Sequence, residues 1–330
     1  MHTHPTLTPQ KQKETRVAAP PITASDAKKD VLRQKRRKAW TPYLLIIPSI
    51  LILLAGLGYP VLWQLRTSTQ KFGLSQQFGQ PPEFVGIDNY IAIFSSSETW
   101  AIVIRSILFC LITAALTLAI GLLLAVLMTA CGSKSRLTLQ ISLLLAWAMP
   151  VVAAMTVWIW LFDRRRGIVN YLLNKIPGLD FYRFDWFERP MTFFIVASII
   201  VIWMSVPFVA FSVYAGLTQI SDEVIEASKL DGATGTQRLR FIIMPMIRPV
   251  IMIVLLLQII WDLRVFTQIK MLQDAGSGAS QFDLLGTYIY KLGTASQDFG
   301  MASAVSVFIL ALTLGISWFY VRNLLAELDS

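Results

Sequence analysis

Polar side chains within one apolar segment, residues 250–271, are the best candidates for direct chemistry in this sequence. Asp262 and Arg264 follow a dozen uncharged residues, and ionisable groups in a membrane span usually face a cavity or one another. Gln258 lies four residues before Asp262 on the same helix face, with Trp261 alongside. Such hydrogen-bonding groups beside an aromatic ring are suited to holding a sugar. The alternative is a structural role, in which Asp262 and Arg264 pair with each other or with a partner subunit.

Trp203 and Ser205, in segment 191–217, are weaker candidates for the same binding surface. Small residues in membrane spans are more often contacts between packed helices.

The sequence offers no catalytic machinery and no metal site. Its only histidines are His2 and His4, so a histidine-based catalytic arrangement within the apolar segments is excluded. Cys110 and Cys131 lie about 30 Å apart along one helix and cannot pair. A phosphate-binding loop of the Gly-x-x-x-x-Gly-Lys-Ser/Thr type is missing. We therefore expect no enzyme activity, no bound cofactor and no ATP hydrolysis by this chain.

Residues 221–245 form the one long polar segment in the C-terminal half of the sequence. Ser221 is a good N-cap for a helix that would end at Gly232, a residue suited to a C-terminal cap. A second short helix is expected to begin near Thr234 and to be ended or kinked by Pro245 and Pro249. Two short helices separated by a glycine make a compact protrusion that can dock into a groove on a partner.

This segment resembles the signature loop of binding-protein-dependent ABC importer permeases. In that family Glu-Ala-Ala is followed by three residues, Gly, nine residues and Ile-x-Leu-Pro. The spacing is intact here, with Ser228 in place of the second Ala and Met244 in place of Leu. The resemblance implies a cytoplasmic coupling loop, residues 218–248, seated in a cleft of a separate ATPase subunit. The expected coupling residues are Glu226, Ala227, Ser228, Asp231, Gly232 and Pro245.

Composition also indicates a membrane protein. Hydrophobic residues make up 55% of the 330-residue chain and charged residues 15%, whereas about a quarter of residues are charged in soluble domains. Six apolar segments reach the roughly 20 residues that a membrane span needs. They are residues 43–65, 101–130, 137–162, 191–217, 250–271 and 299–321. We expect an all-α bundle of six transmembrane helices, which the resemblance identifies as a type I ABC importer permease.

The first 40 residues are expected to be a disordered, basic, cytoplasmic tail, and residues 41–330 the transmembrane permease domain. Residues 1–38 hold ten Lys or Arg and three Asp or Glu, so most of the net charge of +9 lies there. Basic residues before a span anchor it on the cytoplasmic side and contact anionic lipid. Without a folded basic surface, nucleic-acid binding is not expected.

Basic residues in the short loops predict that both termini are cytoplasmic, in the cell membrane of a bacterium, with residues 218–248 on the same side. One loop disagrees, because Arg164–Arg166 falls outside. Its charge is partly offset by four acidic residues of the same loop: Asp163, Asp180, Asp185 and Glu188. The triple arginine is either a solvated face or a contact for a docking partner.

Weaker similarities cover residues 43–322 and favour the sugar-uptake branch of the family, near the larger permease of maltose systems. They include 84–90, 167–170, Trp203, 207–208, 261–266, 288–290 and 299–304. Residues 274–278 depart from a Gly-Gly-Pro common in that loop.

The resemblance implies several partners: a second homologous permease subunit, two ATPase subunits or a homodimer that carry ATP and Mg, and an extracellular solute-binding protein. The substrate would be a di- or oligosaccharide, including an amino sugar. Glycerol-phosphate or polyamine uptake remains the alternative within the family. A self-sufficient ion-coupled carrier or channel is the alternative outside it, although the halves show no duplication of the kind such carriers often carry.

Overall fold

The computed structural model describes residues 43–276 and 278–328. The predicted tail, residues 1–40, lies outside these ranges. The chain forms two units, Met1–Leu62 and Trp63–Ser330, and each is described by itself.

Long apolar helices dominate the fold, as the sequence predicted. Five helices are long and apolar enough to cross a membrane, and a sixth span is possible if one bent pair of helices counts as one. The five are Tyr43–Ser68, Ser97–Ala130, Pro190–Leu217, Arg248–Ala275 and Phe299–Asn323.

The first helix widens into a π-helical turn, η1 (Leu54–Gly58), before it continues as α2 (Tyr59–Ser68). The N–H of Tyr59 donates to the carbonyl of Leu54, five residues back. The next residue, Pro60, has no backbone N–H to donate. The regular α-helical hydrogen bonding is therefore interrupted here, and the helix forms a wider π-helical turn at the interruption.

The centre of the second unit is the packing of α5 (Ser97–Ala130) against α9 (Pro190–Leu217). Small residues allow the close approach: a Cβ on Gly121 would lie only 2.5 Å from the side chain of Val209. Ala125 and Ala210 are fully buried in the same cluster. Tight contact through small residues is the usual way in which helices associate in a membrane.

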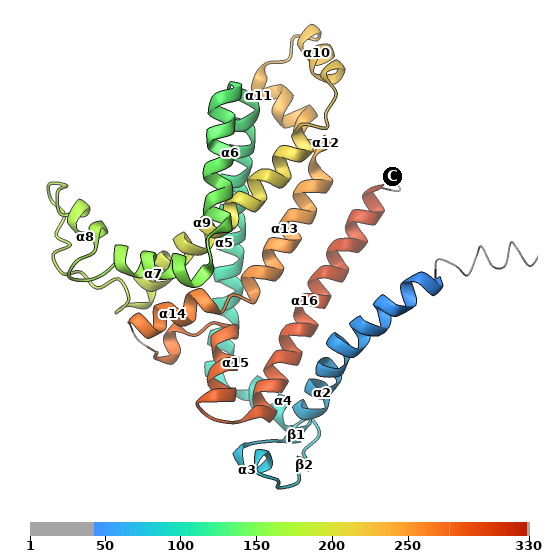
Figure 1. The fold of residues 1–330 in the computed structure, drawn as a ribbon, viewed down its shortest axis with the longest axis vertical. Coiled ribbons are helices and arrows are strands. Elements are labelled where there is room, and N and C mark those ends of the chain that lie inside the picture. The colour runs from blue at the N-terminus through green and yellow to red at the C-terminus, as the bar shows by residue number, and fades with distance from the viewer. Residues whose placement is uncertain (1–42, 277, 329–330) are drawn as a thin grey trace, which may run out of the picture. The chain divides into compact units, whose positions relative to one another are not determined.

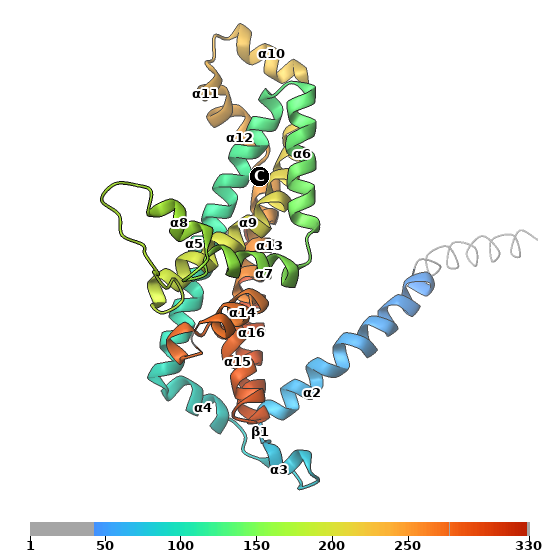
Figure 2. The same cartoon turned by 60° about the vertical axis from the view of Figure 1, so that its left-hand side comes forward.

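The third predicted span is not straight. It consists of α6 (Ser133–Ala148) and α7 (Val151–Leu161), which meet at an angle of 99°. Met149, at the break, has an extended backbone with ψ 127°, because the ring of the following Pro150 disfavours the helical conformation in the residue before it. Figures 1 and 2 both show α7 turning away from the axis of α6.

The predicted span 250–271 is likewise interrupted, at Arg264. It comprises α13 (Arg248–Leu263) and α14 (Thr267–Ala275), and α14 packs against α7 and α9. The helix α16 (Phe299–Leu328) follows α15 (Leu285–Thr294) and packs on it.

Short elements connect these helices. They are β1 (Gln70–Lys71), α3 (Leu74–Gln77), β2 (Glu83–Phe84), α4 (Asp88–Ser95), α8 (Ile168–Leu173) and η3 (Ser280–Phe282). The two strands pair antiparallel, with Gln70 opposite Phe84. Asn89 of α4 holds the start of this hairpin in place, because its Nδ2 donates to the carbonyls of Ser68 and Gln70.

Candidate functional site

Residues 218–248, hereafter the coupling segment, fold as a helix, a turn and a second helical stretch. The first helix, α10 (Asp222–Leu230), is followed by α11 (Gly235–Arg238), η2 (Leu239–Ile243) and α12 (Met244–Met246). Figures 1 and 2 show α10 and α11 beyond the ends of the long helices, at the same end of the second unit as the turn between α5 and α6. The segment is a protrusion, as its sequence predicted.

Gly232 ends the first helix in the predicted way. Its φ is +78°, a left-handed conformation that glycine adopts at little cost, and the N–H of Ala233 reaches back to the carbonyl of Ser228. Thr234 then caps α11 in a capping box with Gln237. The predicted N-cap, Ser221, has the extended backbone of a cap but its side chain makes no capping hydrogen bond.

Pro245 and Pro249 change the helix geometry in the second half of the coupling segment. The N–H of Met244 donates to Leu239, so the helix widens into the π-helical turn η2 just before Pro245, as it does before Pro60. The helical path ends at Ile247, and Pro249 stands in the first turn of α13. Pro245 therefore kinks the helix rather than ending it.

Three large apolar side chains of the coupling segment are exposed within the chain: Leu230, Phe241 and, to a smaller degree, Met246 (49%). Leu230 is 89% exposed and Phe241 is 68% exposed. Among the expected coupling residues, Glu226, Ala227, Asp231, Gly232 and Pro245 are also exposed. Ser228 is buried, and its hydroxyl donates to the carbonyl of Ile225. Exposed apolar side chains on a polar protrusion mark an interaction surface.

The predicted substrate-pathway residues do not share one environment in the structure: some are buried and others are exposed. Gln258 and Asp262 are 1% and 3% exposed on α13. Asp262 accepts hydrogen bonds from Gln258 Nε2 at 2.9 Å and from Thr113 Oγ1 of α5 at 2.8 Å. These side chains therefore join α13 to α5. Thr113 was not predicted from the sequence, although a threonine in an apolar helix is a hydrogen-bond donor that needs a partner.

Trp261 and Arg264 lie on the exposed surface instead. No ion pair joins Arg264 to Asp262 within the part of the chain that the structure describes. The alternative in which these residues pair with a partner subunit stays a prediction. The ring of Trp261 packs edge-to-face on Phe208 of α9 at 5.0 Å. Trp203 packs on Trp158 of α7, and Ser205 is half-buried.

A further polar network, which the sequence did not reveal, holds residues 280–285 to α5. Arg105 Nη1 donates to the carbonyls of Ser280 and Asp283. The Asp283 carboxylate accepts from Gln273 and forms an ion pair with Lys291 at 3.3 Å. Because Arg105 and Asp283 lie 178 positions apart, spacing along the chain gives no signal for this contact.

Comparison with known proteins agrees with this architecture. The family model described as "Binding-protein-dependent transport system inner membrane component" matches residues 117–323. The diacetylchitobiose uptake permease DasB of Streptomyces coelicolor is 35% identical, over 88% of this chain and 89% of its own length. The sulfoquinovosyl glycerol permease SmoG of Agrobacterium fabrum is 33% identical, over 84% and 88%. The trehalose/maltose permease MalF of Thermococcus litoralis is 29% identical, over 87% and 95%.

Two solved structures share the fold. One is a bacterial ABC transporter involved in the import of the acidic polysaccharide alginate, with a TM-score of 0.74, 23% identity and coverage of 89% of this chain and 98% of that one. The other is a bacterial alginate ABC transporter in complex with an alginate pentasaccharide-bound periplasmic protein, with a TM-score of 0.73, 22% identity and coverage of 87% and 94%. With a model match over most of the chain and relatives above 30% identity across nearly its whole length, this multi-pass membrane protein belongs to the family of binding-protein-dependent transport system inner membrane components.

Proposed function

We propose that this chain is the transmembrane subunit of an ATP-driven importer in the cytoplasmic membrane of a bacterium, and that it forms half of the translocation pathway for a di- or oligosaccharide. Relatives named for diacetylchitobiose, sulfoquinovosyl glycerol and trehalose/maltose, each aligned over more than four fifths of this chain, support the saccharide class. An extracellular solute-binding protein delivers the sugar. Glycerol-phosphate, polyamine and ion-coupled transport have no observation in their favour here.

The observation that carries the coupling role is the exposure of Leu230 and Phe241 on a protrusion of otherwise polar character. Apolar anchors of this size fill pockets at the centre of protein interfaces. A separate ATPase subunit, which binds ATP and Mg, is the partner that the signature spacing implies. ATP-driven closure of two such subunits then moves the coupling segments, and α9 and α13, at either end of the segment, carry the motion into the bundle.

On the pathway itself, we assign the sugar contact to the exposed Trp261 and Arg264 rather than to the buried Asp262. A ring face such as that of Trp261 can pack on the apolar face of a sugar, and Arg264 can donate hydrogen bonds to its hydroxyls. Trp203 and Ser205 remain weaker members of the same set. A second permease subunit, different in sequence from this chain, supplies the opposite wall.

The test is to purify the tagged full chain from its own membranes and to measure the ATPase that comes with it. We expect Leu230→Ser with Phe241→Ser to lower ATPase recovery at least tenfold, because two central anchors contribute about 2 kcal/mol each. Phe78→Ser is the matched control, since Phe78 is equally exposed (82%) but lies in a different connection. Equal ATPase recovery with the double variant would refute the coupling assignment.

The same preparation tests the substrate. Reconstituted with its ATPase and its solute-binding protein, the assembly is expected to take up a labelled disaccharide only with ATP. Uptake of glycerol phosphate or a polyamine, with no uptake of any saccharide, contradicts the proposed substrate class and leaves the coupling result intact.

A further inference from the structure

The bend in the third span places the loop that follows it at a defined depth. The helix α6 has 16 residues and is therefore about 24 Å long, most of the roughly 30 Å of a bilayer core. It begins beside Lys134 and Arg136, at the end of the unit that carries the coupling segment (Figure 1). The apolar α7 then turns by 99°. From the length of α6 we infer that α7 and the loop after it lie toward the opposite leaflet.

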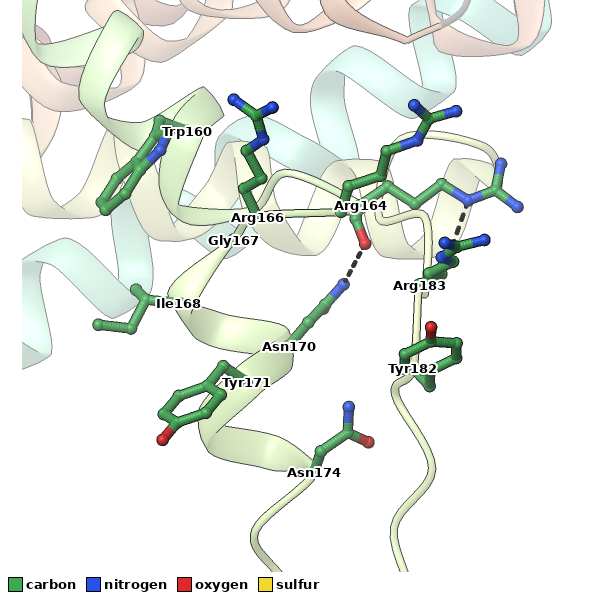
Figure 3. A pocket seen from close by; sticks show the side chains of 11 residues that line it. Trp160, Arg164, Arg166, Gly167, Ile168, Asn170, Tyr171, Asn174, Tyr182 and Arg183 are labelled. Atoms are coloured by element: carbon green, nitrogen blue, oxygen red, sulfur yellow. Dashed lines mark hydrogen bonds between the residues drawn. The ribbon is translucent and has the colours of Figure 1, made fainter.

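The loop between α7 and α9, residues 162–189, is hereafter the arginine loop. It contains a pocket of about 530 Å³, which Figure 3 shows from close by. Its lining includes four arginines and three aromatic side chains. They are Arg164, Arg165, Arg166, Arg183, Trp160, Tyr171 and Tyr182.

Positive charge in the pocket exceeds what the loop neutralises. Asp185 is the only carboxylate in an ion pair with these arginines in the described structure, and it lies 3.9 Å from Arg164. The carboxylate of Asp163 accepts the backbone N–H groups of Arg165 and Arg166 and also interacts electrostatically with the charges of both residues. The guanidinium groups of Arg165 and Arg166 take part in no hydrogen bond or ion pair that the structure describes. Four arginines line this one pocket, and guanidinium groups bind the oxygens of a phosphate by paired hydrogen bonds.

The backbone that carries these arginines is firmly held. Arg164 Nε donates to the carbonyl of Arg183 at 3.0 Å. Arg183 itself has a φ of +55°, a strained conformation for a residue other than glycine, of the kind that clusters at binding sites. Asn170, 5% exposed, accepts from Trp186 Nε1 at 2.6 Å and donates to the carbonyl of Phe184. The charged side chains are therefore presented on a fixed frame.

The surface beside the pocket is apolar. Ile168 and Leu172 of α8, and Ile176 and Leu179 after it, are all exposed. Trp160, Tyr171 and Tyr182, at the pocket, are exposed as well. Aromatic rings and arginines that lie next to exposed aliphatic side chains are typical of a segment at the membrane interface. An acidic protein surface would match the arginines but not this apolar neighbour.

We propose that the pocket of the arginine loop binds the phosphate of a phospholipid headgroup, in the leaflet opposite the coupling segment. Arg165 and Arg166 contact the phosphate oxygens, and the exposed side chains of α8 contact the acyl chains. In the orientation predicted from the basic residues of the other loops, this occupant also accounts for three consecutive arginines on the side that the positive-inside rule disfavours.

The experiment is native mass spectrometry of the purified full chain, titrated with dioleoyl phosphatidylglycerol. We expect one tight lipid adduct, weakened about tenfold by Arg165→Gln with Arg166→Gln. Lys71→Gln with Arg189→Gln is the control, because it removes two exposed positive charges outside the pocket lining, and we expect it to change the affinity by less than about twofold. Dioleoylglycerol, which has the same acyl chains and no phosphate, is expected not to bind at the site.

Several outcomes contradict the proposal. They are equal phosphatidylglycerol affinity in all three proteins, equal binding of dioleoylglycerol, and inorganic phosphate binding as tightly as the lipid. If the double variant keeps the lipid adduct but no longer binds the solute-binding protein, the pocket is a protein-docking site and the lipid assignment is wrong.

Discussion

The coupling segment and the arginine loop stand at the two ends of one helix, α9, and are built in opposite ways. Both carry exposed apolar side chains, but only the arginine loop is basic: it has six Lys or Arg and four Asp or Glu, whereas the coupling segment has four of each. The coupling segment is held by bonds between residues near in sequence, such as Thr234 to Gln237 and Ser228 to Ile225. The arginine loop is cross-linked over longer distances, from Asn170 to Phe184 and from Arg164 to Arg183.

Aromatic packing makes the same distinction. Phe181, Phe184 and Trp186 form a connected cluster within the arginine loop, and Phe162 joins it from the end of α7. In the coupling segment Phe241 stands exposed, with only the guanidinium of Arg240 over its ring. The arginine loop keeps its shape through its own contacts, whereas Leu230 and Phe241 of the coupling segment stay largely uncovered within the chain.

The largest effect is expected from Asn170→Ala. The change removes three hydrogen bonds at a buried position and leaves Trp186 Nε1 without its acceptor, which costs about 3 kcal/mol in the free energy of local opening. Hydrogen–deuterium exchange across residues 162–189 measures it. Ser228→Ala, which removes one local hydrogen bond of the coupling segment, is expected to cost less than about 1 kcal/mol. Equal costs would remove the distinction between the two regions.

A smaller effect is expected from Gly232→Ala in the coupling segment. No atom lies within 4 Å of a Cβ at this position, so only the φ of +78° opposes the change, at about 1–2 kcal/mol. Faster amide exchange in residues 229–235 is the measurement. Gly132→Ala is the control, since this glycine has the same open space and an ordinary φ of −63°. A comparable loss at Gly132 would show that backbone strain is not the cause.

The smallest effect concerns pH and the arginine loop. Backbone N–H groups of Arg166 and Arg165 hold the pKa of Asp163 below its ordinary value of 3.8. A carboxyl whose pKa is lower in the folded state stabilises the fold above the unfolded value and loses this contribution as the pH falls through the folded value. The amides of residues 164–167 should therefore exchange faster as the pH drops below about 4, by less than about 1 kcal/mol because Asp163 is only half-buried and solvent screens its interactions.

The control for this titration is Asp163→Asn, which keeps an oxygen acceptor for the same backbone N–H groups but does not ionise in this range. Its exchange rates, corrected for intrinsic chemistry, should show no transition below pH 4. A transition of the same size in the variant would place the titrating group elsewhere.

Much of the coupling segment was predictable from the sequence. The left-handed Gly232, the cap at Thr234 and the effect of Pro245 depend on residues within a few positions of each other. The number of apolar segments also followed from hydropathy, because a bilayer sets the length of a span. The role of the coupling residues, the cytoplasmic placement of both termini and the sugar contacts stay predictions.

The contacts across the bundle were not predictable in this way. Residues 137–162 were predicted as one continuous span, but α6 and α7 meet at 99°, and this angle depends on what α7 packs against, which includes α14. Asp262 was expected to face a pathway or Arg264, and it instead accepts from Thr113, 149 residues away. Spacing and hydropathy act over a few turns of one helix, so the sequence alone determined the class of protein, its spans and the shape of its protrusion. Which polar groups meet inside the bundle was decided only by the tertiary structure, since a buried donor or acceptor bonds to whichever partner the packing of the helices brings within reach.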